Sequence, residues 1–444
     1  MKLNLNSPHY DIVDLSKLIS NVATPLENKA DLDPLMNYIG DAKYVLLGEA
    51  SHGTHEYYTW RMKISQRLIE EKGFSFIAVE GDWPDCYRLN RYIKNYLHSG
   101  KSAREVLHEF NRWPTWMWAN WEVVAFAEWL KGYNKDLPIN KKTGFYGLDV
   151  YSLWESMEAI TKYLEKNDPQ ALKTAMKAIH CFEPYKAEEG QSYARASCIV
   201  PELCEKEVVN LLTEIRSKIA RYNTDHENVF STEQNALVAV NAEKYYRAMV
   251  HGGPHSWNIR DRHMNTTLER LMKFHGKNAK AIVWEHNTHI GDARATDMVN
   301  DGMVNVGQLV TEQHAEEGVV SVGFGSYKGE VLAGRSWGDV MRKINVPQAT
   351  KGSWEHLVHL AAGGKNKLLM LHKIKNDERI GIHIGHRAIG VVYNPEHEQY
   401  GNYVPSIMPM RYDAFMYLDE TTALHPLHIK PDGHQIPETF PFGM

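Results

Sequence analysis

Four short apolar runs along the chain each lead into acidic or histidine side chains. The first run, YVLL at residues 44–47, continues as GEASHGTHE, so a strand-like segment is followed at once by a carboxylate and two imidazoles. Short continuous apolar runs are typical of strands that are buried on both faces. The other three runs, FIAVEGDWPD, FYGLDVY and AIVWEHNTHIGD, lead into Glu80 and Asp82, into Asp149, and into Glu285, His286, His289 and Asp292.

The order of strand-like and helical segments predicts an α/β fold with a mostly parallel central sheet flanked by helices. Over residues 1–150, the strands YVLLGE, FSFIAVEG and GFYGLDVY alternate with a helix over 54–73 and a helix from about Asp85. From Ser152 to about Lys273 the apolar residues recur at three- and four-residue spacing, as in long helices. Strand-like runs then resume as AKAIVWEHN, GVVSVGFGSY, KGEVLAG, RAIGVVYNP and DAFMYLDE.

The predicted organisation is a catalytic core with one large insertion. Residues 1–150 and 274–444 are expected to form the α/β core, and residues 151–273 a helical insertion that forms one wall or lid of the cleft. A length of 444 residues fits this division, because a single core rarely grows beyond about 250–300 residues.

The four strand ends predict a shared cleft. In an open parallel sheet, ligands bind outside the carboxyl ends of the strands. If the four runs are neighbours, one cleft collects Glu49, His52, Glu80, Asp149, His286 and His289. Polar residues at strand ends also cap the helices that follow, and this is the favoured interpretation for any single acid. The four sites together favour a catalytic cleft.

Composition excludes several classes of protein. A hydrophobic content of 43% and a charged content of 24% are those of a folded globular chain. The net charge of −5 and the absence of a long basic run argue against a nucleic-acid partner. No apolar run approaches the roughly 20 residues of a membrane span. The N-terminal segment MKLNLNSPHYDIVDLSKLI has no secretory pattern, which predicts a cytoplasmic location.

The chain has 4 cysteines and 23 histidines, which points to acid–base or metal chemistry rather than thiol chemistry. The cysteines lack a C-x-x-C spacing and are few for this length, so neither a zinc knuckle nor a disulfide framework is expected. All four are predicted to be buried and reduced: Cys86, Cys181, Cys198 and Cys204.

Two charged residues fall on apolar helix faces. Arg61 lies within an apolar stripe of the helix that follows the first strand, and Asp261 lies within a stripe of the helical segment 257–272, with Arg260 at its edge. A lone buried charge is costly, so Arg61 is expected to pair with Glu49 or Glu80. For each helix taken alone, a structural ion pair explains the pattern.

His52 is the candidate general base. It occupies a Ser-His-Gly turn just after a strand, where Gly53 permits a tight turn or a close approach to a ligand. A carboxylate such as Glu49 can fix the tautomer of His52 and raise its basicity, so that it takes a proton from water. His286 and His289 are candidates to donate to an oxyanion or a leaving group, and equally to bind a metal.

A metal site is the main alternative for the cleft. Glu49, His52, His286 and His289 suit zinc or manganese, and Asp149 adds a further carboxylate. Neither H-E-x-x-H nor H-x-x-E-H occurs in the sequence. Because arginine already balances the acids, the expectation is that no cofactor is required and that exhaustive chelation leaves hydrolysis largely unchanged.

Residues 334–338, GRSWG, match the G-x-S-x-G nucleophile elbow, with Ser336 as the nucleophile. The segment WGDVMRKI after Ser336 has a pattern compatible with a helix, as an elbow requires. The pattern is nevertheless weak in a chain with 31 glycines. No acid and histidine partners stand at helpful strand ends, although three histidines follow in the sequence: His372, His383 and His386.

The segment RWPTWMWANWEVVAFAEWL holds five tryptophans close together. Aromatic clusters more often form core than pocket, but some of these rings are candidates to line a large apolar ligand site. Trp116 is the residue of this segment that is predicted to bind substrate. The other predicted substrate-binding residues are Arg260, His286 and Asp149.

Six motifs together carry a resemblance to a known family: GEASHGTHEYY, VEGDWPD, GLDVY, NIRDRHM, WEHNTHIGDAR and FMYLDETTALHPL. In this order they span nearly the whole chain and resemble the erythromycin esterase family. The resemblance implies an α/β core with a helical insertion, and hydrolysis of an ester or lactone by activated water without a covalent acyl-enzyme. It also implies the site residues: His52 as general base supported by Glu49, then Arg61, Glu80 and His289 lining the site, with His286 as a further histidine of the motif.

The sequence is therefore interpreted as that of a cytoplasmic hydrolase that cleaves a small-molecule carboxylic ester or macrolide lactone with His52 as general base. A metal- or ligand-binding protein with a histidine-rich cleft and no ester turnover is the alternative. Families with these motifs include macrolide-resistance enzymes and enzymes of generic esters, so the motifs leave the substrate open. They do not define an oligomeric state.

Overall fold

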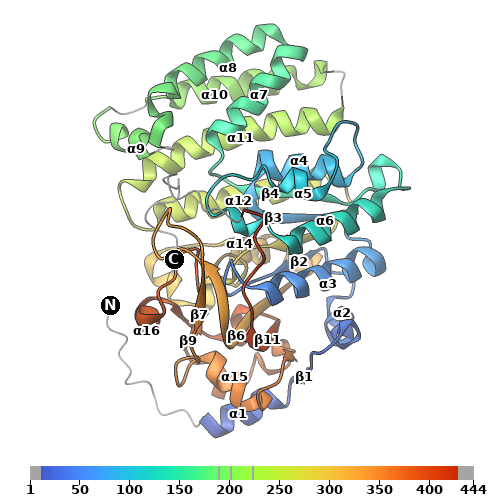
Figure 1. The fold of residues 1–444 in the computed structure, drawn as a ribbon, viewed down its shortest axis with the longest axis vertical. Helices are drawn as coiled ribbons and strands as arrows, with labels where there is room; N and C mark the ends of the chain where they lie inside the picture. Colours follow the sequence, from blue (N-terminus) through green and yellow to red (C-terminus); the bar gives the residue numbers. More distant parts are fainter. Residues whose placement is uncertain (1–11, 189–190, 201–202, 223–224, 429–444) are drawn as a thin grey trace.

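The computed structural model describes residues 12–188, 191–200, 203–222 and 225–428. The N-terminal segment for which no secretory signal was predicted lies partly outside these residues. Figure 1 shows a twisted sheet in the middle of the molecule, with helices on both sides and a helical region at one end. Among the described helices, none is long and apolar enough to cross a membrane.

The main sheet is mostly parallel, as the sequence predicted. Its strands follow the order β1-β8-β11-β6-β2-β5-β3-β4, and β7 pairs with β6. Six neighbouring strands run parallel: β11 (Ala414–Thr421), β6 (Val319–Ala333), β2 (Tyr44–Leu47), β5 (Ala281–Trp284), β3 (Phe76–Asp82) and β4 (Gly144–Asp149). The antiparallel strands are β1 (Ala23–Pro25), β8 (Lys367–Leu369) and β7 (Arg342–Val346).

The sheet is covered on both faces, which explains the continuous apolar runs of its inner strands. Val45 and Leu47 of β2 belong to one apolar core, and Tyr44 and Leu46 to another on the opposite face. The first core contains residues of α3 (His55–Lys72), α4 (Trp83–Ile93), α5 (Ala103–Leu107) and α6 (Trp121–Asn134). The second contains residues of α1 (Ile12–Ser20), α12 (Pro254–His275), α14 (Val306–His314) and α15 (Trp354–Ala362).

Helix α3 has the apolar stripe and the stop signal that the sequence predicted. Tyr57, Trp60, Ile64 and Leu68 are all buried on the sheet side. The helix ends at Gly73, whose left-handed φ of 66° suits a residue without a Cβ. This helix follows the His52 turn directly and thereby fixes its direction.

Between β4 and β5 the described residues form six α-helices, and the first five share an apolar core of their own. Figure 1 shows them at the top of the view. The five helices are α7 (Leu153–Asn167), α8 (Pro169–Phe182), α9 (Gln191–Ser197), α10 (Glu205–Lys218) and α11 (His226–Met249). The sixth helix, α12, leads back to the sheet and contributes Met264, Leu268 and Leu271 to a core of the sheet.

The prediction that all four cysteines are reduced is wrong. Cys181 at the end of α8 and Cys204 before α10 form a disulfide, with their Cα atoms 5.8 Å apart. Their 23-residue separation gave no signal, because only the packing of α8 against α10 brings them together. Cys198 is free and exposed, and only Cys86 is both free and buried. The cytoplasmic location remains a prediction, against which a disulfide weighs.

The C-terminal third differs from the predicted strand pattern in three places. GVVSVGFGSY and KGEVLAG form one long strand, β6, because its first half pairs with β2 and β11 and its second half with β7. The segment 337–346 is a loop followed by β7 rather than a helix. RAIGVVYNP is mostly irregular after β9 (Ile384–Arg387), which pairs with β10 (Tyr403–Ser406). Its apolar residues cover the turns after β2 and β6, as bridges from Ile389 to Ser51 and from Val392 to Gly334 show.

Short helices complete the described chain: α2 (Asp33–Ile39), α13 (Asn287–Ile290), α16 (Glu398–Gly401) and α17 (Met408–Arg411). Of these, α13 follows β5 at the carboxyl edge of the sheet and carries His289.

Candidate active site

A cavity of about 110 Å³ lies at the carboxyl edge of the parallel strands. Strands β2, β5, β3 and β4 are adjacent and parallel, so the polar residues after them meet there. Six of the residues selected from the sequence line the cavity: His52, Glu80, Asp149, Arg260, His286 and His289. Glu49 and Arg61 are buried behind His52. Trp116 is buried in the core, where it packs edge-to-face against Trp113, and Trp113 lines the cavity in its place.

His52 is held by a chain of charged groups. Its Nδ1 lies 2.9 Å from Oε1 of Glu49, and Nη2 of Arg61 donates to the other carboxylate oxygen over 2.7 Å. A carboxylate accepts the proton of Nδ1, so Nε2 is the ring nitrogen with a lone pair for the cavity. The chain therefore fixes His52 in the tautomer that a general base requires.

Arg61 pairs with Glu49 and not with Glu80, the other partner that the sequence allowed. Its guanidinium lies over the rings of Tyr58 and Trp284, at 4.3 and 4.8 Å from their centres. Cation–π contacts of this kind stabilise a buried guanidinium that has one carboxylate partner. Arg61 thus holds the carboxylate that orients His52.

The turn that carries His52 is pressed against the sheet. Leu332 of β6 and Leu424 both donate backbone hydrogen bonds to the Gly53 carbonyl. A Cβ at Gly53 would lie 1.9 Å from the Leu332 carbonyl oxygen. Gly53 is therefore needed for close contact with β6 rather than with a ligand, and this contact fixes the position of His52.

The pKa of His52 is raised above its ordinary value. Burial alone would lower this pKa, but the hydrogen bond to Glu49 and the negative charges of Glu80 and Glu49 outweigh burial and the opposing charge of Arg260. The imidazole is thus a stronger base than an exposed histidine.

Arg260 joins two of the predicted acids. It donates to both oxygens of Asp149, at 2.9 and 2.7 Å, and to Oε1 of Glu80 at 2.6 Å. Burial would raise the pKa of Glu80, but His289, Arg260 and His52 lower it well below the ordinary value. Glu80 lies in β3 and Asp149 is the last residue of β4, so this arginine of α12 fastens the helix across the sheet edge.

His289 stands between Arg260 and Asp261. Nη1 of Arg260 lies 3.0 Å from Nε2 of His289, and Nδ1 of His289 lies 2.9 Å from Asp261. A guanidinium only donates, so Nε2 accepts and Nδ1 carries the proton. The ring also stacks on Trp257 at 4.5 Å. Both nitrogens are occupied, and His289 supports Arg260 in this arrangement.

His286 is different, because one of its nitrogens has no partner. Its Nδ1 lies 2.8 Å from the Thr288 hydroxyl and accepts from the Thr288 backbone N–H, which places the proton on Nε2. Among the described residues, Nε2 has no hydrogen-bond partner. Burial and the neighbouring His52 hold the pKa of His286 well below its ordinary value. The ring is thus a neutral N–H donor, 4.9 Å from the His52 ring between centres.

Some strand-end acids have other roles. Asp292 caps the 3₁₀ turn that follows it, as the capping interpretation expects. Glu285 is fully buried, and burial raises the pKa of its carboxyl well above the ordinary value. Asp82 lines the cavity and binds Arg112 over 2.5 Å, and burial raises the pKa of Asp82 to about 7.

Sequence reasoning missed part of the cavity wall. Arg112 and Trp113 come from the tryptophan-rich segment, from which only Trp116 was selected. Tyr151 follows β4, and Trp337 and Val391 come from loops in the C-terminal third. Apolar residues in irregular segments have no periodic pattern, so the only available signal was the aromatic clustering around Trp113.

The G-x-S-x-G segment does not have the geometry of an elbow. The chain passes from β6 into bends and turns over residues 335–338, not into a helix. Ser336 is exposed, while the neighbouring Trp337 lines the cavity. The later His386 is buried, and its two ring nitrogens form hydrogen bonds with Glu355 and Asn287. Trp337 is thus the residue of this segment that belongs to the site.

The side chains considered as metal ligands in the cleft already bind other protein side chains. Glu49 holds His52 and Arg61, and Arg260 occupies Asp149 and Glu80. Among the described residues, the group of three with metal-ligand spacing is a different one, formed by His55, Glu122 and His425.

The fold and cleft together define an α/β protein whose sheet edge carries a carboxylate-held histidine beside an arginine–acid network. A model of the erythromycin esterase family matches residues 69–421. The chain belongs to this family. The matched range contains Glu80, Asp149, Arg260, His286 and His289, and begins after the His52 turn.

Similar proteins agree with this assignment. Erythromycin esterase type II of Escherichia coli is 24% identical over 379 residues, which cover 80% of this chain and 86% of the relative. A solved structure of a succinoglycan biosynthesis protein is 21% identical with a TM-score of 0.75, covering 94% of this chain and 100% of its own. A solved structure of a Bacillus cereus protein is 19% identical with a TM-score of 0.77, and the match covers 95% of this chain and 100% of that protein's chain. A mutant of the erythromycin esterase EreC in its open conformation is 14% identical with a TM-score of 0.65, and the match covers 89% of this chain and 95% of the EreC chain. At these identities the structures show a shared fold.

Proposed function

We propose that this protein hydrolyses a carboxylic ester or macrolide lactone with water that His52 activates. The observation that carries the proposal is the position of His52: it lines the cavity while Glu49 holds its Nδ1, which directs the basic Nε2 to the reaction. A cavity histidine whose pKa is raised by its carboxylate partner is suited to deprotonate water. Membership of the erythromycin esterase family supports ester hydrolysis as the reaction.

The reaction needs no covalent intermediate. Nε2 of His52 takes a proton from water as the water oxygen attacks the ester carbonyl carbon. The imidazolium then returns that proton to the alkoxide that leaves, so the products are an acid and an alcohol. The Glu49 carboxylate stabilises the imidazolium, and Arg61 balances the charge of Glu49.

The carbonyl oxygen becomes negative during attack and requires a donor. We assign this role to the guanidinium of Arg260, because the His286 ring also lines the cavity but its Nε2 is shielded from solvent. Arg260 lines the cavity and carries positive charge, held in place by Glu80, Asp149 and His289. Donors fixed before the reaction stabilise the transition state without reorganisation.

The cavity wall suits a substrate with a large apolar surface. Five apolar or aromatic side chains form part of this wall: Phe110, Trp113, Met117, Trp118 and Tyr151. Tyr151 and Arg260 bring the segment 151–273 into contact with this space, in keeping with the proposed wall or lid. A panel of simple esters and macrolides, assayed for release of the carboxylic acid, distinguishes a generic esterase from a macrolide esterase.

Turnover by chelator-treated protein tests the proposal against its rival, a metal- or ligand-binding protein without hydrolysis. Protein treated exhaustively with chelator is expected to keep most of its ester hydrolysis at 25 °C, because His52 acts on water directly. Acid release is followed by pH-stat titration before and after treatment. Loss of turnover that one divalent metal restores would reassign His52 as a ligand.

Ser336→Ala is expected to retain at least about half of the wild-type kcat, because the attacking group is water and the exposed Ser336 lies outside the cavity lining. Stopped-flow assays of an activated ester measure this together with the pre-steady-state phase. A stoichiometric burst of alcohol, abolished in the variant, would instead establish a serine nucleophile.

A further inference from the structure

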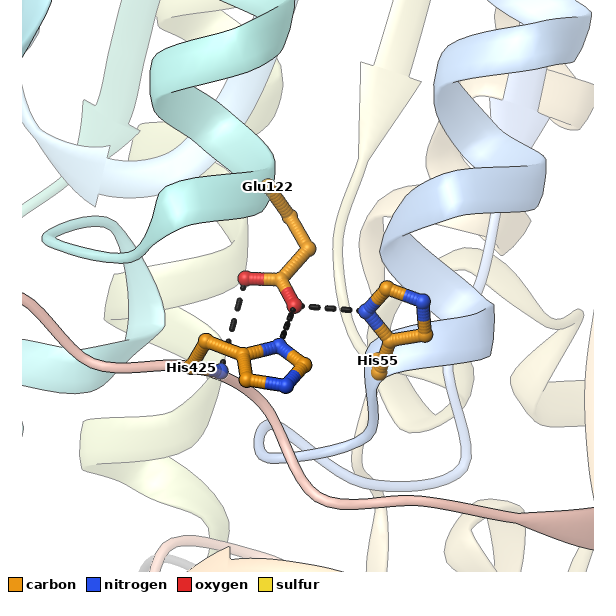
Figure 2. A group of neighbouring side chains, drawn as sticks. All are labelled: His55, Glu122 and His425. Atoms are coloured by element: carbon orange, nitrogen blue, oxygen red, sulfur yellow. Dashed lines mark hydrogen bonds and ion pairs between the residues drawn. The ribbon is translucent and has the colours of Figure 1, made fainter.

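A second group of ionisable side chains lies outside the cavity lining. Nδ1 of His55 and Nδ1 of His425 each lie 2.6 Å from the same oxygen of Glu122, Oε1. Figure 2 shows the two rings approaching this carboxylate from different parts of the chain. One candidate ligand atom from each residue lies within 4.8 Å of the others. The role proposed for His52 uses none of these three residues.

Three distant segments meet at this group. His55 is the first residue of α3, and Glu122 is the second residue of α6. His425 belongs to residues 422–428, which follow β11 and are called here the C-terminal strap. The strap bridges to Thr54 at Ala423 and to Asn120 at Pro426.

Backbone hydrogen bonds hold the strap against both helix starts. The N–H of His55 donates to the Thr422 carbonyl over 2.9 Å, and the N–H of Trp121 donates to the His425 carbonyl over 2.9 Å. The three side chains are therefore brought together by a fixed backbone and not by chance contact of long side chains.

We propose that His55, Glu122 and His425 bind one divalent transition-metal ion of the zinc class. Two imidazoles and one carboxylate form a ligand set that zinc uses, with a fourth position for water. Glu122 is almost fully buried, while the side chains of His55 and His425 are 33% and 63% exposed. The ion thus has a buried anionic ligand and a route from solvent.

The hydrogen bonds at Glu122 mark the place of the cation. Both imidazole Nδ1 atoms lie 2.6 Å from Oε1 of Glu122, so the three ligand atoms already surround the position that a cation would take. A metal ion takes the place of the Nδ1 protons that now face this carboxylate: a neutral ring then carries its proton on Nε2, and a protonated ring releases one proton. Metal-bound ligands at about 2.0–2.1 Å stand roughly 3.3 Å apart in a tetrahedron, so the exposed rings need to separate only slightly.

The ion has a structural consequence. It ties the strap to the starts of α3 and α6, and α3 begins three residues after His52. The part of the tryptophan-rich segment that lines the cavity, residues 112–118, comes just before α6. A bound ion therefore stabilises the strap and the two helix starts, while the chemistry at His52 proceeds without it.

Metal titration of the full-length, tag-free protein tests this site. After removal of metals by chelation, Zn²⁺ is added in a calorimeter and Co²⁺ is added while the visible absorption is recorded. The expected result is one ion per chain, with a thermal midpoint that rises as Zn²⁺ is added. Absence of stoichiometric binding would overturn the proposal.

Four variants locate the ion. His425→Ala removes an exposed ligand and is expected to weaken Zn²⁺ binding by more than the ~10–100-fold loss that an outer-sphere substitution typically causes. Glu122→Gln is expected to do the same. His428→Ala is the matched control, because His428 lies on the same strap and its ring packs against that of His108. It is expected to bind Zn²⁺ as the wild type does.

His52→Ala separates this site from the cleft and is also expected to bind Zn²⁺ normally. Binding that survives His425→Ala but disappears in His52→Ala would place the ion in the cleft and overturn the proposal. Circular dichroism of each variant establishes that it is folded. Because the readout is metal binding, failure of the hydrolase proposal leaves this result intact, and the reverse also holds.

Discussion

His52→Ala is expected to lower kcat/KM for ester hydrolysis by about 10²–10⁴-fold, the usual contribution of a general base. The substitution removes the Nε2 lone pair and leaves the Glu49–Arg61 pair in place behind the cavity. Steady-state assays with an activated ester and with a macrolide measure the loss. Unfolding followed by circular dichroism serves as the control, because the fold should persist. Near-normal activity in a folded variant would show that another group activates water.

The dependence of kcat/KM on pH provides an independent readout of His52. Protonated imidazole has no lone pair, so activity should fall as pH falls through the pKa of His52. Burial lowers this pKa, but the Glu49 hydrogen bond and the charges of Glu80 and Glu49 together raise it by more than burial lowers it. The acidic limb is therefore expected above the ordinary histidine pKa of 6.5. In His52→Ala this limb should disappear from the residual activity. An unchanged limb would assign it to another group.

Arg260→Gln is expected to lower the free energy of unfolding by about 3–5 kcal/mol, because it leaves two buried carboxylates without their cation. Asp149 and Glu80 both lose a charged donor, and His289 loses the donor to its Nε2. Glu80 and Asp149 lie in different strands, so the loss also frees α12 from the sheet edge. Urea unfolding followed by tryptophan fluorescence measures the change.

Arg294→Gln is the matched control for this prediction. Arg294 also contacts two acids, Asp292 and Glu312, but its side chain is 45% exposed. Exposed ion pairs contribute about 0–1 kcal/mol, since water and salt screen them. Equal losses in the two variants would show that the Arg260 network contributes no more than a surface pair.

Family membership and local geometry support different parts of the functional argument. The family match covers residues 69–421 and includes most of the acids and histidines of the cleft. The His52 turn lies before this range, so the role of His52 is argued from its contacts with Glu49 and the cavity. Fold alone hosts many chemistries, and the experiments on His52 therefore address the site itself.

Local patterns in the sequence were sufficient to predict the parallel core. The apolar runs before Glu49, Glu80 and Asp149 are strands in the structure, and the stripe and terminal glycine of residues 54–73 form α3. Strand period, helix period and caps depend on neighbouring residues, so they are encoded within short segments. Because parallel strands end at one edge, adjacency of the strands was enough to bring His52, Glu80, Asp149, His286 and His289 together.

What only the tertiary structure decided is which charged group meets which. Arg61 pairs with Glu49. Arg260 instead pairs with Glu80 and Asp149, which lie 180 and 111 residues before it in the sequence. The same holds for Cys181 with Cys204, and for His425 beside His55. The irregular segment after Arg387 looked like a strand because it is apolar, but its partners are the turns after β2 and β6. Such pairings depend on how helices and loops pack around the finished sheet, and no local period records that packing.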